Sequence, residues 1–192
     1  MCIRDSCRLV AQEFAGSDKR EDLYAGTPPL SATRYLLSDA VSRGKNSRRT
    51  KLMVVDVKRA FLNGLCTRSL YIELPGAESQ GGKYVGKLLR ALYGTRDAPL
   101  AWLTVVKNDM KEMGFHECKV ANGVYTHHER NLKAVAHVDD FLLSGESHQL
   151  QWFRDHMSKK YELKVQVVGW GRDDAKELDF LGRVIRTTPT GI

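Results

Sequence analysis

The stretch that decides the fold runs from Ala134 to Leu143 and reads AVAHVDDFLL. Two apolar segments flank the acidic pair Asp139-Asp140, a pattern typical of a β-hairpin that carries carboxylates at its tip. Asp-Asp is also an ordinary turn dipeptide, because short polar side chains stabilise turns. At this point two interpretations stay open, a carboxylate site and a simple turn.

A second apolar run, LMVV at 52–55, stops at Asp56. A carboxylate at the end of a buried strand is costly unless something pairs with it. If this strand neighbours the hairpin, Asp56, Asp139 and Asp140 converge at one sheet edge and repel each other unless cations lie between them. Oxygen-rich sites suit magnesium, and two ions roughly 3.5–4 Å apart activate an attacking oxygen and stabilise a leaving phosphate oxygen.

Around these runs, the apolar periodicity and the turn residues predict further elements. We expect helices over 31–42, 99–113 and 147–161, and strands over 70–73, 123–125, 163–168 and 180–185. Because strands and helices come in mixed order, the predicted fold class is α+β with a mainly antiparallel sheet packed on helices. The 192 residues suffice for one domain or two small lobes.

Composition narrows the possible partners. Thirty Lys and Arg against twenty-three Asp and Glu give a formal charge of +7, which favours polyanions such as nucleic acid. Part of the excess lies in a predicted basic loop over 43–51. No apolar run reaches the roughly 18 residues of a membrane span, so we expect no membrane partner.

The cysteines and the amino terminus carry no site. Cys2, Cys7, Cys66 and Cys118 have neither disulfide-framework nor zinc-site spacing, and a reducing, intracellular compartment fits best. His116, Cys118, His127 and His128 match no usual zinc signature either. The leader 1–6, MCIRDS, resembles translated sequencing adapter and is expected to lie outside the fold.

Several motifs occur in a fixed order along nearly the whole chain beyond the leader. The main ones are DVKRAFLNG at 56–64, LLRALYGTRDAPLAW at 88–102 and HVDD at 137–140, supported by CRLVAQEF at 7–14, AGTPPL at 25–30 and FLG at 180–182. Together they resemble the reverse transcriptase domain of Ty1/copia-type retrotransposons. The resemblance implies a reverse-transcriptase-like palm with partial fingers over 7–192, the thumb being absent.

The resemblance also implies the residues of the site. Asp56, Asp139 and Asp140 are the expected catalytic residues, and Asp56, Val57, Asp139 and Asp140 the expected metal ligands, for Mg²⁺ with Mn²⁺ as a substitute. The expected nucleotide-binding residues are Phe61, Tyr93, Gly94 and Arg8, and the expected primer-binding residues are Phe180, Leu181 and Gly182. The Phe61 ring would exclude a 2′-hydroxyl and select deoxynucleotides; its alternative is an ordinary core aromatic.

The implied function is an RNA-directed DNA polymerase that adds dNTPs to a primer. Its expected partners are an RNA template, a DNA or RNA primer and the rest of the retrotransposon polyprotein, in the cytoplasm within a virus-like particle or in the nucleus. Two departures from the family pattern, His137 before Val-Asp-Asp and Asp97 in place of Gln, put turnover in doubt. The alternatives are an inactive remnant that at most binds nucleic acid, and a two-metal nuclease.

Overall fold

The computed structural model describes residues 9–13, 25–42, 50–74, 76–172 and 174–188. They fall into two compact units. The first unit holds the described part of Met1–Ala25 together with Arg59–Val106, and the second holds the described parts of Gly26–Lys58 and Lys107–Ile192. The chain therefore forms the two lobes that its length allows.

The second unit is built on a six-stranded sheet with the order β4-β5-β6-β7-β1-β8. Every neighbouring pair is antiparallel, which confirms the predicted α+β class with a mainly antiparallel sheet. The central strands are β1 (Thr50–Val57), β6 (Leu132–His137) and β7 (Asp140–Glu146), and the outer strands are β4 (His116–Glu117), β5 (Val124–His127) and β8 (Leu163–Val168).

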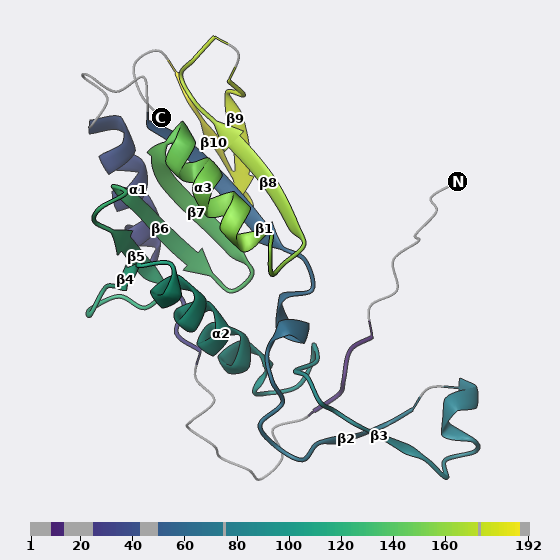
Figure 1. Cartoon of the computed structure of the whole chain (residues 1–192). Coiled ribbons are helices and arrows are strands. Elements are labelled where there is room, and N and C mark those ends of the chain that lie inside the picture. The colour runs from purple at the N-terminus through teal and green to yellow at the C-terminus, as the bar shows by residue number, and fades with distance from the viewer. Residues whose placement is uncertain (1–8, 14–24, 43–49, 75, 173, 189–192) are drawn as a thin grey trace, which may run out of the picture. The chain divides into compact units, whose positions relative to one another are not determined.

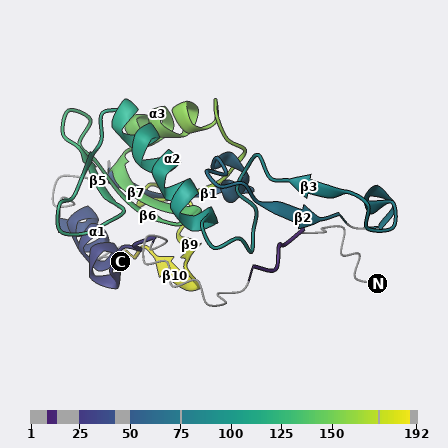
Figure 2. The same cartoon turned by 90° about the horizontal axis from the view of Figure 1, so that it is seen from below.

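The two faces of this sheet carry different elements (Figures 1 and 2). Helix α1 (Leu30–Ser42) and the hairpin of β9 (Glu177–Phe180) and β10 (Arg183–Arg186) lie on one face, and α3 (Ser147–Met157) lies on the other. Because strand side chains alternate, even-numbered residues of β1 and β7 face α1. The buried cluster on that face joins α1, the sheet and the hairpin through Leu36, Ala40, Leu52, Val54, Leu142, Phe180 and Ile185.

Helix α3 forms because its apolar residues recur at helical spacing and bury one face. Leu150, Phe153 and Met157 are buried, and the Phe153 ring lies 6.3 Å from that of Phe141 in β7. We expected the helix to reach Tyr161, but it ends at Met157. The Tyr161 hydroxyl instead donates a hydrogen bond to Asp109, so this residue is bound outside the helix.

The first unit contains the hairpin of β2 (Tyr71–Glu73) and β3 (Val85–Lys87), with the 3₁₀ turns η2 (Ala60–Asn63) and η3 (Gly76–Ser79). Helix α2 (Ala98–Glu112) begins in this unit and continues into the second. Pro99 lies in its first turn, as predicted, because the missing N–H of proline has no intrahelical partner there. Ala98, Trp102 and Val106 are its buried residues in this unit.

None of the helices in the described residues combines the length and the apolar character needed to cross a membrane.

Candidate active site

The acidic residues of the two apolar runs meet on neighbouring strands. Asp56 of β1 is the register partner of Asp140 of β7, and Asp140 is the register partner of His137 of β6. The backbone N–H of Val57 donates to the carbonyl oxygen of Asp139 at 2.9 Å, which holds the hairpin turn against the end of β1. β1 and β7 are neighbouring inner strands, so Asp56 and Asp140 lie at adjoining strand ends of the sheet.

The side chains of Asp56, Asp140 and His137 share one face of the sheet. Side chains two positions apart on a strand lie on the same face of the sheet. Each of these three residues is two positions away from a member of the buried cluster under α1, namely Val54, Leu142 and Val135. This face is therefore apolar beneath α1 and acidic just beyond it. The alternation of β-strand side chains alone produces this boundary.

The electrostatics of Asp140 reflect this crowding of like charges. Burial first, and then the charges of Asp139 and Asp56, raise the pKa of Asp140 above its ordinary value of 3.8, while His137 acts to lower it. Divalent cations relieve repulsion of this kind, and carboxylate oxygens are the ligands that Mg²⁺ prefers. The donor set therefore suits magnesium in kind, although no three His, Cys, Asp or Glu side chains in the described residues are grouped so that they could hold an ion.

The turn that presents Asp139 has an uncommon backbone. Val138 has φ of 58°, in the left-handed region that β-branched residues rarely adopt. Backbone strain of this kind persists only where the surrounding structure imposes it. Here the pairing of β6 with β7 and the bond from Val57 to Asp139 fix both ends of the turn.

The expected primer-binding residues form the turn between β9 and β10. Leu181 and Gly182 have φ of 52° and 70°, the backbone of a tight hairpin turn. Phe180 is buried in the cluster under α1, whereas Leu181 is 41% exposed. Phe180 and Leu181 line a pocket of about 250 Å³ together with His137, the neighbour of Asp140. The structure thus places Phe180 and Leu181 in one pocket with the register partner of Asp140.

The expected nucleotide-binding residues lie in the first unit. The ring centroids of Phe61 and Tyr93 are 4.7 Å apart. Gly94 has φ of 88°, and a Cβ there would lie 1.9 Å from the carbonyl oxygen of Ala11, whose own N–H donates to Tyr93. Only glycine fits this approach. Arg8 lies outside the described residues, as do the leader 1–6 and most of the basic loop.

The partner of Asp97 becomes apparent only in the folded structure. Arg68 binds both carboxylate oxygens of Asp97, at 2.9 and 3.0 Å, and both oxygens of Glu13 at 2.9 Å. Hydrogen bonds from Arg68 are the main reason why the pKa values of Asp97 and Glu13 lie below their ordinary values. The charge of Asp97 is therefore countered locally. Arg68 lies in a stretch without motif or apolar periodicity, so its pairing with Asp97 could not be predicted from the sequence.

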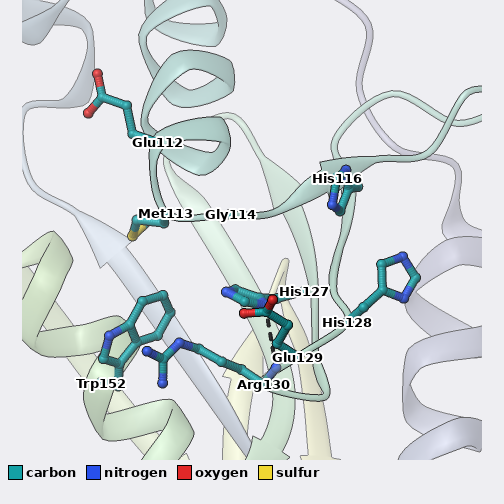
Figure 3. Close-up of a pocket in the computed structure, with 9 residues that line it drawn as sticks. All are labelled: Glu112, Met113, Gly114, His116, His127, His128, Glu129, Arg130 and Trp152. Atoms are coloured by element: carbon teal, nitrogen blue, oxygen red, sulfur yellow. Dashed lines mark hydrogen bonds between the residues drawn. The ribbon is translucent and has the colours of Figure 1, made fainter.

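The histidines set aside as zinc ligands line a separate pocket of about 520 Å³ (Figure 3). His127 is buried, accepts a hydrogen bond from the backbone N–H of Arg130 at 3.4 Å and is bound to the backbone of Met113. Burial lowers its pKa, so it serves as a neutral core residue. Cys118 is exposed and does not line this pocket.

Comparison with known proteins assigns this chain to a family. The sequence profile of the family "Reverse transcriptase (RNA-dependent DNA polymerase)" matches residues 2–169. The retrovirus-related Pol polyprotein from transposon RE1 of Arabidopsis thaliana is 30% identical over 98% of this chain. That from transposon TNT 1-94 of Nicotiana tabacum is 29% identical over 84%. The chain spans only 12% of the length of each of these relatives.

A chain in the structure of telomerase from Candida albicans, in complex with a fragment of telomeric RNA, matches 89% of this chain with a TM-score of 0.49 and 13% identity. The match covers 36% of that telomerase chain. The profile match over residues 2–169 and the two Pol polyproteins show that this chain belongs to the reverse transcriptase (RNA-dependent DNA polymerase) family, and that its domain is of the type found in copia-type retrotransposon Pol polyproteins.

Proposed function

We propose that this chain is the fingers-and-palm part of an RNA-directed DNA polymerase, which adds dNTPs to a primer paired with an RNA template. The observation that carries the proposal is the register pairing of Asp56 with Asp140, with Asp139 at the adjoining turn. In a reverse transcriptase family member, carboxylates at adjoining strand ends and at the turn beside them are suited in kind to metal-assisted phosphoryl transfer.

In this proposal Asp56, Asp139 and Asp140 hold two Mg²⁺ ions, which Mn²⁺ can replace, and Val57 contributes from the same strand end. The bound ions supply activation of the primer 3′-hydroxyl and stabilisation of the leaving phosphate oxygen. The chain itself orients the carboxylates through the β1–β7 pairing and fixes Asp139 through the Val57 N–H. Burial is the main cause of the raised pKa of Asp140, and the charges of Asp139 and Asp56 add to it; this second contribution is the repulsion that cations would relieve.

Nucleotide selection is assigned to the first unit. Phe61, packed on Tyr93, would lie under the incoming sugar, and the Tyr93-Gly94 segment would line the nucleotide pocket. Arg8 is proposed as a contact to the triphosphate. Phe180, Leu181 and Gly182 are proposed to hold the primer, and the pocket that Phe180 and Leu181 share with His137 supports this assignment.

Primer extension on a homopolymer RNA template with magnesium tests the polymerase. The parent chain should extend, whereas Asp139→Asn should lose nearly all extension, because one cation loses a charged ligand while the side chain keeps its size. The loss should be at least about a hundredfold, since metal ions stabilise much of the developing phosphate charge. Asp155→Asn is the matched control, because Asp155 is an exposed aspartate of α3.

Equal extension by Asp139→Asn and the parent would refute the catalytic assignment. One observation favours the alternative of an inactive remnant, since His137 stands directly beside Asp140 where the family usually has Tyr or Phe. If neither the parent nor a His137→Tyr, Asp97→Gln variant extends primers while both bind nucleic acid, the remnant is the correct reading. The two-metal nuclease predicts instead magnesium-dependent cleavage of the template without extension.

The wider setting is also a proposal. The relatives are Pol polyproteins, so we propose that this domain acts with the rest of such a polyprotein, inside the cell, in a cytoplasmic virus-like particle or in the nucleus. Its direct partners would be the template, the primer and dNTPs, with no membrane partner.

A further inference from the structure

Two histidine rings lie side by side on the wall of the larger pocket, on the side away from Trp152 (Figure 3). The ring centroids of His116 and His128 are 5.5 Å apart, and both residues are exposed. His116 belongs to β4 and is the register partner of Thr126, whereas His128 directly follows β5, two positions beyond Thr126. The pairing of β4 with β5 therefore sets the two imidazoles next to each other as diagonal neighbours.

The ring nitrogens of this pair are available to a ligand. Within the part of the chain that the structure describes, neither His116 nor His128 has a hydrogen-bond or ion-pair partner. Other histidines differ: the Nε2 atom of His148 lies 2.9 Å from the side-chain amide of Gln149, and His156 is bound to a backbone carbonyl through Nδ1. The pair thus combines exposure with unused nitrogen donors.

His127 lines the same pocket but stands apart from the pair. It is buried, and its ring makes edge contacts with Phe115 and Trp152, at centroid distances of 5.2 and 5.6 Å. These contacts hold the ring in the core. His116 and His128 are therefore the two exposed imidazoles of the pocket.

The separation of the two rings suits a metal ion held between them. Bonds from zinc to imidazole nitrogen are about 2.0–2.1 Å long, so each ring centre lies about 3 Å from the ion, and the two centres lie about 5 Å apart in a tetrahedral site. The observed distance is 5.5 Å. Exposed side chains change rotamer rapidly, so both rings can turn a nitrogen towards the ion.

The charges around the pocket leave room for a cation. Glu112 and Glu129 line it, and Glu112 is paired with Lys160. Arg130 lines it too, but its guanidinium is stacked on Trp152, 3.8 Å from the ring centroid. The two carboxylates offset the charges of Lys160 and Arg130, so no excess of positive charge opposes a bound cation.

We propose that His116 and His128 together bind one divalent late transition-metal ion, of the class of Zn²⁺, Ni²⁺ and Cu²⁺. Imidazole nitrogen suits these ions, whereas Mg²⁺ prefers oxygen ligands. No third His, Cys, Asp or Glu side chain in the described residues joins the pair, so water fills the remaining coordination positions. The bound ion links β4, an outer strand of the sheet, to the turn between β5 and β6.

This site is separate from the proposed catalytic one. The turn that carries His128 adjoins the Leu132 end of β6, whereas the turn that carries Asp139 adjoins the His137 end. The two ends lie roughly 15–20 Å apart along the strand. The inference therefore does not depend on the proposed polymerase.

Isothermal titration calorimetry of the full chain with Ni²⁺ provides the first arm. His116→Ala and His128→Ala should each raise the Kd at least about tenfold, because the ion then keeps only one of its two nitrogen ligands. His148→Ala is the matched control, because the His148 side chain is 69% exposed and does not line the pocket. Circular dichroism confirms that each variant is folded.

The second arm tests whether the two histidines act on one ion. If they do, the double variant should bind Ni²⁺ little more weakly than either single variant, because the chelate is already broken. Zn²⁺ should also raise the Tm of the parent and of neither single variant, since an ion bound only by the folded chain stabilises it. Two independent sites would instead lose one ion per single variant at unchanged Kd, which would overturn the inference.

The third arm separates this ion from the proposed catalytic metals. Asp139→Asn should bind Ni²⁺ as the parent does, and an excess of Mg²⁺ should not displace the Ni²⁺. Loss of Ni²⁺ binding in Asp139→Asn would place the ion at the carboxylates and overturn the inference. Unchanged Ni²⁺ binding by the double variant of His116 and His128 would overturn it as well, whatever the result of primer extension.

Discussion

At the scale of single residues, Asp97 shows how a change of residue is accommodated. Its side chain is 11% exposed and shares Arg68 with Glu13, so the charge that departs from the family pattern is held in an ion-pair network. Asp97 stands directly before α2, and its backbone carbonyl oxygen accepts the N–H of Ala101. Asp97 is therefore a structural residue of the first unit.

Arg68→Met should destabilise the first unit by roughly 1–3 kcal/mol at pH 7, less than a fully buried pair because all three groups keep some solvent contact. The pKa values of Glu13 and Asp97 are lowered in the folded chain, so the unfolded chain binds protons first as the pH falls. The stabilisation is complete above the unfolded values of 4.5 and 3.8 and is lost as the pH drops through the folded ones.

Urea unfolding of the parent and Arg68→Met between neutral and acid pH measures the difference in their free energies of unfolding. This difference should shrink below about pH 4. Arg186→Met is the control, because Arg186 pairs with Glu177 at the surface, where both side chains are more than half exposed. A constant difference at all pH values would show that Arg68 acts through packing alone.

Phe61 allows a second test at this scale. If its ring excludes the 2′-hydroxyl, Phe61→Ala should raise incorporation of ribonucleotides relative to deoxynucleotides in the primer-extension assay. Phe61→Tyr keeps the ring and should leave the ratio unchanged. An unchanged ratio for Phe61→Ala would make Phe61 a packing partner of Tyr93 and nothing more.

At the scale of elements, two glycines with the same backbone conformation separate conformational strain from close packing. Gly123, before β5, has φ of 71°, and a Cβ there would lie 2.6 Å from the carbonyl oxygen of Ala136 and 3.2 Å from Pro28. Gly182, in the β9–β10 turn, has φ of 70° with open space around it.

Gly182→Ala should therefore cost about 1 kcal/mol of unfolding free energy, the cost of a left-handed backbone alone. Gly123→Ala should cost more than twice as much, because the contact of β5 with β6 and the segment before α1 must also shift. Chemical denaturation of both variants gives the comparison. Equal losses of unfolding free energy would mean that the backbone between β5 and β6 shifts without destabilising the protein.

At the scale of the whole molecule, the charge of +7 bears on association with nucleic acid. Affinity for a primer–template should fall by about a hundredfold or more between roughly 50 and 200 mM salt, because Lys and Arg contacts release counterions from phosphates. Anisotropy titrations across this range test it. Lys160→Gln should leave the slope unchanged, because Lys160 is paired with Asp109 and Glu112. Affinity independent of salt would rule out the basic surface as the nucleic-acid contact.

Local patterns in the sequence predicted most elements of the second unit. The Asp-Asp hairpin, the strand ending at Asp56 and the helix before Gly44 all follow from apolar periodicity and turn residues, which act over a few positions. Predicted ends were less accurate, as at α3, because contacts such as that of Tyr161 with Asp109 come from distant parts of the chain.

The sequence by itself determined the residue types of the site, the order of the motifs and the excess of positive charge. Only the tertiary structure decided that Asp56 pairs in register with Asp140, that Arg68 neutralises Asp97, and that the rings of His116 and His128 lie side by side. The physical reason is that periodicity reports which face of an element is buried, whereas strand order and register depend on packing between segments far apart in the chain.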